Sequence, residues 1–457
     1  MTKHFFGWTF IFLWVTLPLH GYANQDERKV DWTYINTLSG LELLKYFQNE
    51  LQFEGDDAML FWKKIPVSKE NQQIYRIYRK QMFAFFLSKH PSRFTTAEYS
   101  FQFGKGKEII GPMSKQPLKL PFSYIIPLPT GPIGNPKQTY KIGYTIHGFN
   151  HPWLLNNADS ALWEAKQHAN VKLNVLDPEF DNGKQVEHIK QWIAEGYDGI
   201  MIWPKVEGPA ANSTNKALEQ GIKVVSVDRF TGAPSITHRI VGDFPANGAQ
   251  QGIYLIHKLL EDQGAVKGNI VMIRKPMGSS ADAYRTGHFL KIASYFPGLR
   301  IVANYHNNSS REKSREQVLE VLNWLDNIDI IFCTGAAQSM GAIDALNETG
   351  KWFARKGHRK IIILSNDDAR ASMNAIKVGK QDMLAPYTPL LGGIGIRALL
   401  NAITDADQKR VRDVLMPYLP MVTYKPQKIF GIQTLGVEQW MPYAYGPNES
   451  QTPLHQP

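Results

Sequence analysis

The chain has 457 residues, of which 43% are hydrophobic and 20% are charged, so its composition is that of a globular protein and excludes a disordered one. The formal net charge is +10, but the basic residues are spread thinly without a run of five like charges, which argues against nucleic-acid binding. A single cysteine, Cys333, excludes an intrachain disulfide, so core packing must stabilise the fold.

The first 23 residues have the features of a secretory signal peptide. Lys3 supplies the positive charge, residues 5–19 form an apolar run, and Gly21 and Ala23 are small residues at the expected cleavage positions. The alternative is a retained anchor helix, although the apolar run is short for a membrane span. Export without disulfides favours a bacterial periplasm, and we expect the mature protein there.

Residues 24–111 are predicted to be an N-terminal extension, rich in aromatic and charged residues and mostly helical. Residues 31–50 and 69–88 have helical patterns, and the second could be a partner-binding face, although packing onto the protein body is the simpler interpretation. Seven prolines fall within residues 112–136, and proline blocks both helices and central strands. Residues 112–137 are therefore expected to be a linker.

From residue 140 onward, short β-branched segments alternate with helical stretches about every 25–30 residues. The expected strands cover residues 141–146, 171–176, 199–203, 223–227, 239–242, 269–273, 301–304, 329–333, 360–364 and 382–385. Helices are expected between them, for example over residues 153–169, 247–262, 311–325 and 339–349. This alternation predicts an α/β fold with parallel sheets, and so many strands favour two doubly wound, Rossmann-like lobes with a site in the cleft between them.

Two neighbouring strands of the expected first lobe end in side chains that can bind a ligand. The apolar run at residues 222–227 stops at Asp228 and Arg229, and the run at residues 198–203 ends with Trp203 before a proline. In parallel sheets, ligands bind outside the carboxyl ends of the strands. A carboxylate and a guanidinium fork suit the vicinal hydroxyls of a sugar, although a purely structural ion pair is the alternative.

Five segments, taken in order and with their spacing, resemble the type I periplasmic binding proteins of the ribose-binding group. They are residues 145–153, with a polar turn before Pro152 and Trp153; residues 196–204, Gly-Tyr-Asp-Gly-Ile-Met-Ile-Trp-Pro; residues 224–229, Val-Val-Ser-Val-Asp-Arg; residues 241–249, Val-Gly-Asp-Phe-Pro-Ala-Asn-Gly-Ala; and residues 361–368, Ile-Ile-Ile-Leu-Ser-Asn-Asp-Asp. The resemblance covers about residues 138–420. It extends to the related autoinducer-2-binding periplasmic proteins.

This resemblance implies two α/β lobes joined by a three-segment hinge. The first lobe would comprise residues 138–242 and 388–418, the second residues 243–387 and 419–445, and residues 446–457 would be a tail. The implied ligand contacts are His147, His151, Trp153, Trp203, Asp228 and Arg229 from the first lobe, with Arg285, Asp367 and Tyr387 from the second lobe or the hinge.

The second lobe departs from the family pattern at three places. Ala283 stands where the family often has an arginine, Gly335 where it has a ligand-contacting asparagine, and residues 308–310 are Asn-Ser-Ser where an aromatic ring often stacks. The second lobe is therefore expected to offer fewer hydrogen bonds than a pentose or hexose site, which leaves the identity of the ligand open.

Several of these residues have competing interpretations. Trp153 and Trp203 could be core residues, and His147, His151 and His168 could suggest a metal site, but His147 and His151 flank a turn and lack a completing acid or cysteine, so no metal is expected. Asp367 and Asp368 could suggest an acid–base pair, but no nucleophile, oxyanion donors or second acid accompany them, so no catalysis is expected. Asp368 is expected to cap a helix over residues 369–378. The glycines of residues 392–395 are expected to allow close helix packing at the hinge.

We therefore expect a periplasmic solute-binding protein that closes its lobes on a small polyhydroxylated ligand and delivers it to the permease of an ABC-type transporter. The alternative is a ligand sensor that docks on the periplasmic domain of a membrane sensor kinase, as the resemblance to autoinducer-2-binding proteins suggests. No enzymatic activity, cofactor or nucleic-acid partner is expected, and we expect a monomer.

Overall fold

The computed structural model describes residues 96–103, 107–114, 132–149, 152–168, 170–242, 244–293, 296, 298–353, 359–387, 389, 391–404, 413–416, 420–429, 432–441 and 444–446. The expected signal peptide, the two expected N-terminal helices and His151 lie outside these residues. Within them, no helix combines the length and the apolar character that crossing a membrane would require.

The first lobe is built on a parallel sheet with the strand order β13-β7-β6-β5-β3-β4. Its strands are β3 (Tyr140–Ile146), β4 (Val171–Leu176), β5 (Gly199–Trp203), β6 (Lys223–Val227), β7 (His238–Gly242) and β13 (Asp413–Met416). The helices that cover it are α5 (Pro152–Ala165), α6 (Asn182–Ala194), α7 (Ala211–Glu219) and α13 (Leu391–Thr404).

Alternating side chains of the central strands β5 and β6 face two separate cores, which is why these two strands are largely apolar. Met201 and Val225 pack in the core under α5 and α13, whereas Ile200 and Val224 pack with α6 and α7 on the opposite face. The sheet is therefore buried on both sides, as expected of a doubly wound lobe.

The second lobe contains the sheet β17-β14-β12-β11-β10-β8-β9, in which only the β12–β14 pairing is antiparallel among the described strands. The strands are β8 (Gly268–Arg274), β9 (Leu299–His306), β10 (Ile330–Cys333), β11 (Ile362–Asn366), β12 (Met383–Ala385), β14 (Val422–Thr423) and β17 (Leu435–Gly436). Its helices are α8 (Phe244–Gln263), α9 (Ser280–Ala293), α10 (Arg311–Trp324), α11 (Ala336–Thr349), α12 (Arg370–Lys377) and α14 (Val437–Trp440). Helices α8 and α9 pack on one face of the sheet, and α10 and α11 pack on the other.

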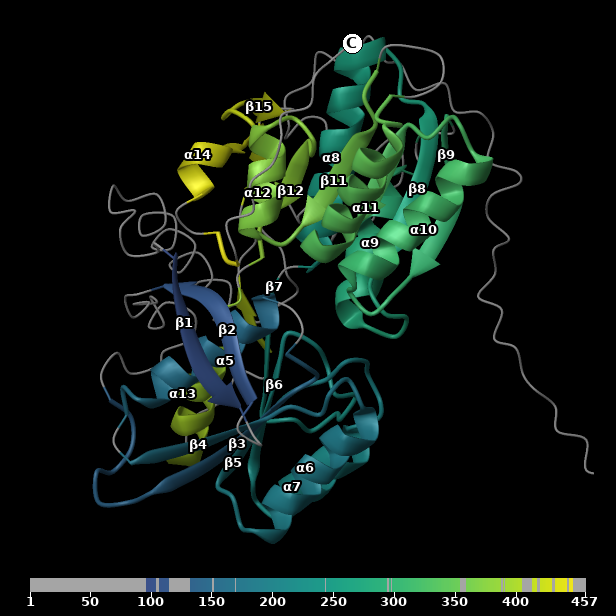
Figure 1. Cartoon of the computed structure of the whole chain (residues 1–457). Coiled ribbons are helices and arrows are strands. Elements are labelled where there is room, and N and C mark those ends of the chain that lie inside the picture. Colours follow the sequence, from purple (N-terminus) through teal and green to yellow (C-terminus); the bar gives the residue numbers. More distant parts are fainter. Residues whose placement is uncertain are drawn as a thin grey trace, which may run out of the picture.

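The chain passes between the two sheets three times: between β7 and α8, between β12 and α13, and between β13 and β14. Figure 1 shows the two lobes one above the other, with these connections between them. The predicted α/β class with two lobes is confirmed, and the expected strands at residues 171–176, 199–203 and 223–227 have the bounds of β4, β5 and β6.

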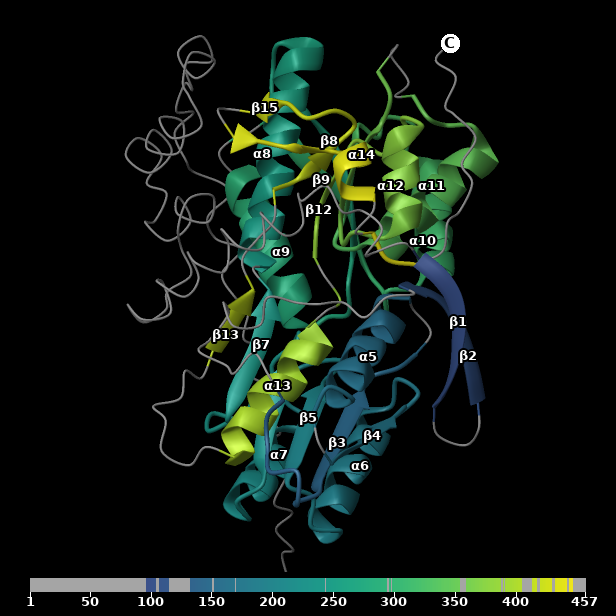
Figure 2. The same cartoon turned by 90° about the vertical axis from the view of Figure 1, so that its left-hand side faces the viewer.

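Two small antiparallel pairs lie outside the main sheets. Strands β15 (Lys428–Ile429) and β16 (Ile432–Gln433) form one. Strands β1 (Thr96–Phe103) and β2 (Lys107–Ser114) form a hairpin in the N-terminal extension, and β2 contacts α5 of the first lobe (Figure 2). The sequence did not predict this hairpin, and β2 ends two residues beyond the expected start of the linker at residue 112.

Candidate ligand-binding site

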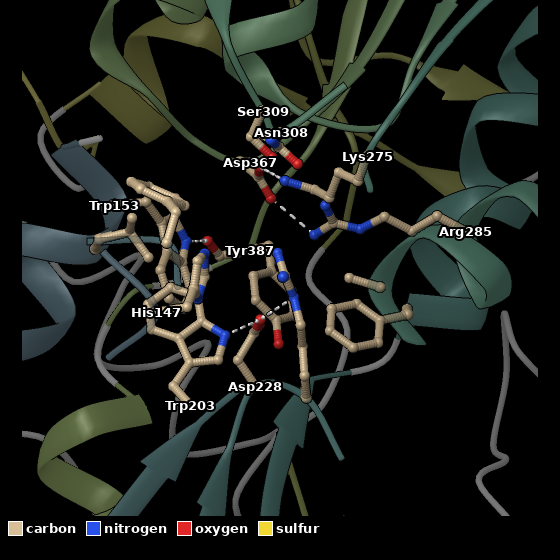
Figure 3. A pocket seen from close by; sticks show the side chains of 15 residues that line it. His147, Trp153, Trp203, Asp228, Lys275, Arg285, Asn308, Ser309, Asp367 and Tyr387 are labelled. Atoms are coloured by element: carbon tan, nitrogen blue, oxygen red, sulfur yellow. Dashed lines mark hydrogen bonds and ion pairs between the residues drawn. The ribbon is translucent and has the colours of Figure 1, made fainter. Parts of the chain in front are cut away.

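A cavity lies between the two lobes (Figure 3), with about 450 Å³ of empty space that includes open solvent. Eight of the nine predicted site residues line it: His147, Trp153, Trp203, Asp228, Arg229, Arg285, Asp367 and Tyr387. The ninth, His151, lies outside the described residues. The fold thus brings residues that are up to 240 positions apart in the sequence to one place.

Each lobe contributes an aspartate from the carboxyl end of a strand. Asp228 follows β6 and Asp367 follows β11, and both have left-handed backbones with φ of 67° and 70°. Their backbone N–H groups donate to the carbonyls of Ile240 at 2.7 Å and Ala385 at 3.0 Å, respectively, on the next strand. A left-handed conformation turns the chain sharply, and aspartate tolerates it better than most residues do. Both lobes therefore use the same backbone device to present a carboxylate.

Strained backbone is concentrated at this cavity. Six described non-glycine residues have positive φ angles, and four of them line the cavity: Phe180, Asp228, Ser309 and Asp367. Such conformations persist where the surrounding structure enforces them, and they cluster at functional sites.

On the first-lobe wall, Trp203 and Arg229 hold the carboxylate of Asp228. The indole Nε1 of Trp203 donates to Asp228 Oδ2 at 2.8 Å, and Arg229 Nε lies 3.3 Å from the same oxygen. Arg229 also donates from Nη1 to the carbonyl of Lys205. Burial raises the pKa of Asp228 and the Arg229 charge opposes this rise, whereas burial lowers the pKa of Arg229.

Aromatic rings form a second wall, with Tyr387 at its centre. Trp153 stacks on Tyr387 with ring centroids 5.6 Å apart, and Phe244 stacks on the same ring at 5.0 Å. The Tyr387 hydroxyl accepts from the backbone N–H of Gly242 at 3.1 Å, and a Cβ at Gly242 would lie only 2.0 Å from the tyrosine ring. The Trp153 indole donates to the Tyr387 carbonyl at 2.9 Å. Tyr387 is therefore held between two of the connections that join the lobes.

The second-lobe wall is more basic than the sequence suggested. Arg285 Nη2 donates to Asp367 Oδ1 at 2.7 Å, and Lys275 Nζ lies 3.4 Å from Asp367 Oδ2 (Figure 3). Lys275 was absent from the predicted set, although its position directly after β8 is the strand-end signal that identified Asp228. Phe180 and Phe244 also line the cavity, and no sequence signal pointed to them.

Asp368 does not cap a helix as expected. Helix α12 begins at Arg370, and its N-cap residue is Ala369, which makes no side-chain capping bond. Asp368 instead accepts from the indole Nε1 of Trp440 at 3.2 Å, and burial raises its pKa to about 7. Its role is to join the end of β11 to the C-terminal helix α14.

Two other candidates have structural surroundings. His168 accepts from the backbone N–H of Ile133 at 2.8 Å and contacts Glu164 at 2.8 Å, and the described residues contain no group of three metal-ligating side chains. Gly392 and Gly395 allow α13 to pack closely, because added Cβ atoms would lie 2.2 Å from the Asn157 carbonyl and 2.7 Å from Met201.

The two lobes touch next to residues that line the cavity. The Glu207 backbone N–H of the first lobe donates to the Gly278 carbonyl of the second at 3.1 Å, and the rings of Phe230 and Tyr284 meet edge to face at 6.4 Å. The two lobes are therefore in direct contact beside the cavity in this conformation.

The sequence of this chain is similar to those of several curated proteins. Among curated proteins, the ribose import binding protein RbsB of Bacillus subtilis (strain 168) is 23% identical over 292 residues, which is 64% of this chain and 90% of the relative. The galactofuranose-binding protein YtfQ of Escherichia coli (strain K12) is 21% identical over 261 residues, covering 56% of this chain and 80% of the relative.

Solved structures show the same fold. An ABC transporter solute-binding protein from Bacillus halodurans C-125 with bound myo-inositol aligns with a TM-score of 0.58 at 22% identity, covering 66% of this chain and 97% of that one. The arabinose-transporter binding protein of Shewanella sp. ANA-3, bound to arabinofuranose, gives 0.56 at 23% identity, covering 62% and 91%. A family model described as a periplasmic binding protein domain matches residues 142–407. The chain therefore belongs to the periplasmic binding protein family.

Proposed function

We propose that this chain is a periplasmic solute-binding protein that captures a small, sugar-like molecule between its lobes and presents the closed form to an ABC-type membrane permease. The observation that carries the proposal is the convergence of charged strand-end residues from both lobes with stacked aromatic rings on one cavity of about 450 Å³.

The chemistry of the walls suits a polyhydroxylated ring. The carboxylates of Asp228 and Asp367 can accept hydroxyl hydrogens, and the guanidinium groups of Arg229 and Arg285 can donate to hydroxyl oxygens. The rings of Trp153, Trp203 and Tyr387 supply apolar surface for the C–H face of a sugar. We propose binding without catalysis, since the family consists of binding proteins.

The lobes are expected to close on the ligand because each lobe supplies some of the residues that contact it. A ligand that contacts Asp228 of one lobe and Asp367 of the other stabilises the conformation in which both are near, and so shifts the population toward it. The contact between Glu207 and Gly278 belongs to that conformation. The closed surface is what a membrane partner would recognise.

A second candidate partner is a membrane signalling receptor. It is favoured by the β1–β2 hairpin, which precedes the family match at residues 142–407 and adds a surface to the first lobe. The neighbouring genes discriminate the two: a permease and an ATPase support transport, and a histidine kinase supports sensing.

Thermal-shift measurements of the mature protein against neutral sugars, polyols and sugar acids test the proposed function. A ligand at a hundred times its dissociation constant adds about 2.7 kcal/mol to the free energy of unfolding. We expect Asp228→Asn to weaken binding at least about tenfold, because it removes a buried charged acceptor while asparagine still tolerates the left-handed backbone.

The exposed substitution Glu219→Gln on α7 is the matched control and should bind as the wild type does. A panel without any shift, or unchanged binding by Asp228→Asn, would contradict the proposed function.

A further inference from the structure

The described residues that line the cavity carry unequal numbers of opposite charges. Arg229, Lys275 and Arg285 are cations, and Asp228 and Asp367 are the carboxylates. All five side chains belong to residues that are no more than 9% exposed. The neighbouring acid Asp368 does not line the cavity and is bonded to Trp440. These side chains therefore leave one positive charge without a counter-charge.

The excess charge lies on the second-lobe wall. In the first lobe, Asp228 is matched by Arg229. In the second lobe, Arg285 and Lys275 share the single carboxylate of Asp367, at 2.7 Å and 3.4 Å. Arg285 also donates to the carbonyl of Thr334 at 2.7 Å. Lys275 makes the longer of the two contacts to Asp367, and its ammonium carries three donors.

Gly335 provides the space that Lys275 occupies. A Cβ at Gly335 would lie 2.7 Å from Lys275 Nζ and 2.9 Å from Asp367 Oδ2. The family resemblance puts a ligand-contacting asparagine at this position. In this chain, Gly335 has no side-chain amide, and the ammonium of Lys275 lies beside it. A cationic group is therefore available to the ligand where the family has a neutral one.

A buried net charge is costly unless an opposite charge compensates for it. Burial lowers the pKa of Lys275, and a carboxylate within hydrogen-bonding distance would favour its charged form again. Asp228 and Asp367 would repel a dianion such as a phosphate group, and both carboxylates can accept hydroxyl hydrogens. The excess positive charge and the two carboxylate acceptors of the cavity thus match a molecule with several hydroxyls and a single negative charge.

We infer that the ligand of this cavity is a sugar acid, a polyhydroxylated molecule bearing one carboxylate, and that Lys275 selects this carboxylate. The inference rests on the proposed function as a solute-binding protein, and it names the class of solute. It also explains one departure of the second lobe from the family pattern: at Gly335, a neutral amide is lost and the ammonium of Lys275 lies beside that position.

Isothermal titration with matched probes tests this inference on the mature protein. The pairs are D-galactose with D-galacturonate, D-glucose with D-glucuronate, and D-mannose with D-mannuronate. We expect at least one acid to bind about tenfold or more tightly than its neutral partner, as one charge-assisted hydrogen bond predicts. Lys275→Met, which keeps most of the apolar stem, should weaken binding of that acid about 10- to 100-fold.

Lys275→Arg should retain most of the preference for the acid, because it restores the charge. Lys313→Met, at an exposed lysine of α10, is the matched control and should bind both probes as the wild type does. Circular dichroism checks that each variant is folded, and Lys275→Gln replaces the methionine variant if that variant is unfolded.

The possible failures are distinguishable. Binding of neutral sugars without any preference for acids would overturn the sugar-acid inference and leave the proposed function intact. An acid that binds equally well to Lys275→Met would overturn the role of Lys275. Silence from every probe pair would overturn the inference together with sugar binding itself.

Discussion

Asp367 and Asp368 are adjacent in the sequence, yet the fold gives them different surroundings. Asp367 lies in the cavity beside Arg285 and Lys275, whereas Asp368 is turned away toward the indole of Trp440. Both side chains are buried, but two cations compensate the charge of Asp367 only. A difference of one position at the end of β11 therefore determines that Asp367 lines the cavity and that Asp368 stabilises the surrounding fold.

This difference makes the stability of the protein depend on Asp368 protonation. Burial raises the pKa of Asp368 from 3.8 to about 7, so the folded state favours its protonated form. The stabilisation of the folded state by protonated Asp368 is complete below about pH 4 and is lost as the pH rises through about 7. We expect Asp368→Asn to gain stability relative to the wild type over this range, by on the order of 1–4 kcal/mol.

Urea denaturation at pH 4.5, 6.0 and 7.5 measures the effect, and Glu219→Gln, which removes an exposed carboxylate, is the control. A difference between Asp368→Asn and the wild type that stays constant across this pH range would show that Asp368 does not titrate as the fold implies.

At the scale of elements, the sequence predicted what is local and missed what depends on packing. Strand β5 (Gly199–Trp203) was predictable because a parallel strand buried on both faces is a continuous apolar run. Strands β14 (Val422–Thr423) and β17 (Leu435–Gly436) have two residues each, too few to show any periodicity. Strand β14 pairs with β12 and β17 pairs with β14, and the sequence does not reveal these contacts.

The same distinction applies to the site. Asp228 and Trp203 were found because each ends an apolar run. Tertiary contacts bring Phe180 and Phe244 to the cavity, where Phe180 packs on His147 and Phe244 stacks on Tyr387, so no local pattern marks them. Lys275 has the strand-end signal but was missed, because lysines at strand ends are common surface residues and only the contact with Asp367 distinguishes this one.

Helix packing gives a test at this scale. An added Cβ at Gly392 of α13 would lie 2.2 Å from the backbone carbonyl of Asn157 in α5, whereas one at Gly287 of α9 would meet nothing within 4 Å. We expect Gly392→Ala to destabilise the fold by about 1–3 kcal/mol or more through overpacking. Gly287→Ala should instead stabilise it by about 0.5–1 kcal/mol, because alanine is the better helix former.

Chemical denaturation measures the free energy of unfolding of both variants. The test is the sign of each change: Gly392→Ala should lower this free energy, and Gly287→Ala should raise it. Equal effects of the two substitutions would mean that α13 and α5 are not packed as closely as the structure shows.

At the scale of the whole molecule, the cavity and the connections between the lobes form one unit. Tyr387, which lies in the connection between β12 and α13, bonds to Gly242 at the end of β7, where another connection starts. Arg285 of the second lobe lies over the same ring, with its guanidinium carbon 4.8 Å from the centroid. Any opening of the lobes must therefore disturb the wall of the cavity, which couples ligand binding to lobe movement.

A reversible crosslink tests this coupling. A Cβ at Gly278 would lie 3.7 Å from Val206 Cβ across the contact between the lobes, within the range of roughly 3.5–4.5 Å that disulfides require. The double substitution Val206→Cys with Gly278→Cys should therefore join the lobes on oxidation. The native Cys333 is buried, and burial raises its thiol pKa, so it should not compete. Gly278 has a φ of 82°, so a cysteine there is expected to cost about 1–2 kcal/mol.

If the ligand enters only when the lobes separate, the oxidised double variant should neither bind an added probe nor release one loaded beforehand, and reduction should restore both. Stopped-flow tryptophan fluorescence can follow the exchange of the sugar or sugar acid that stabilises the wild type, because Trp153 and Trp203 line the cavity. Val206→Cys alone, treated with the same oxidant, is the control and should exchange ligand as the wild type does. Exchange at the wild-type rate in the crosslinked protein would mean that the ligand reaches the cavity without lobe opening, and the contact between Glu207 and Gly278 would then be a static feature of the fold.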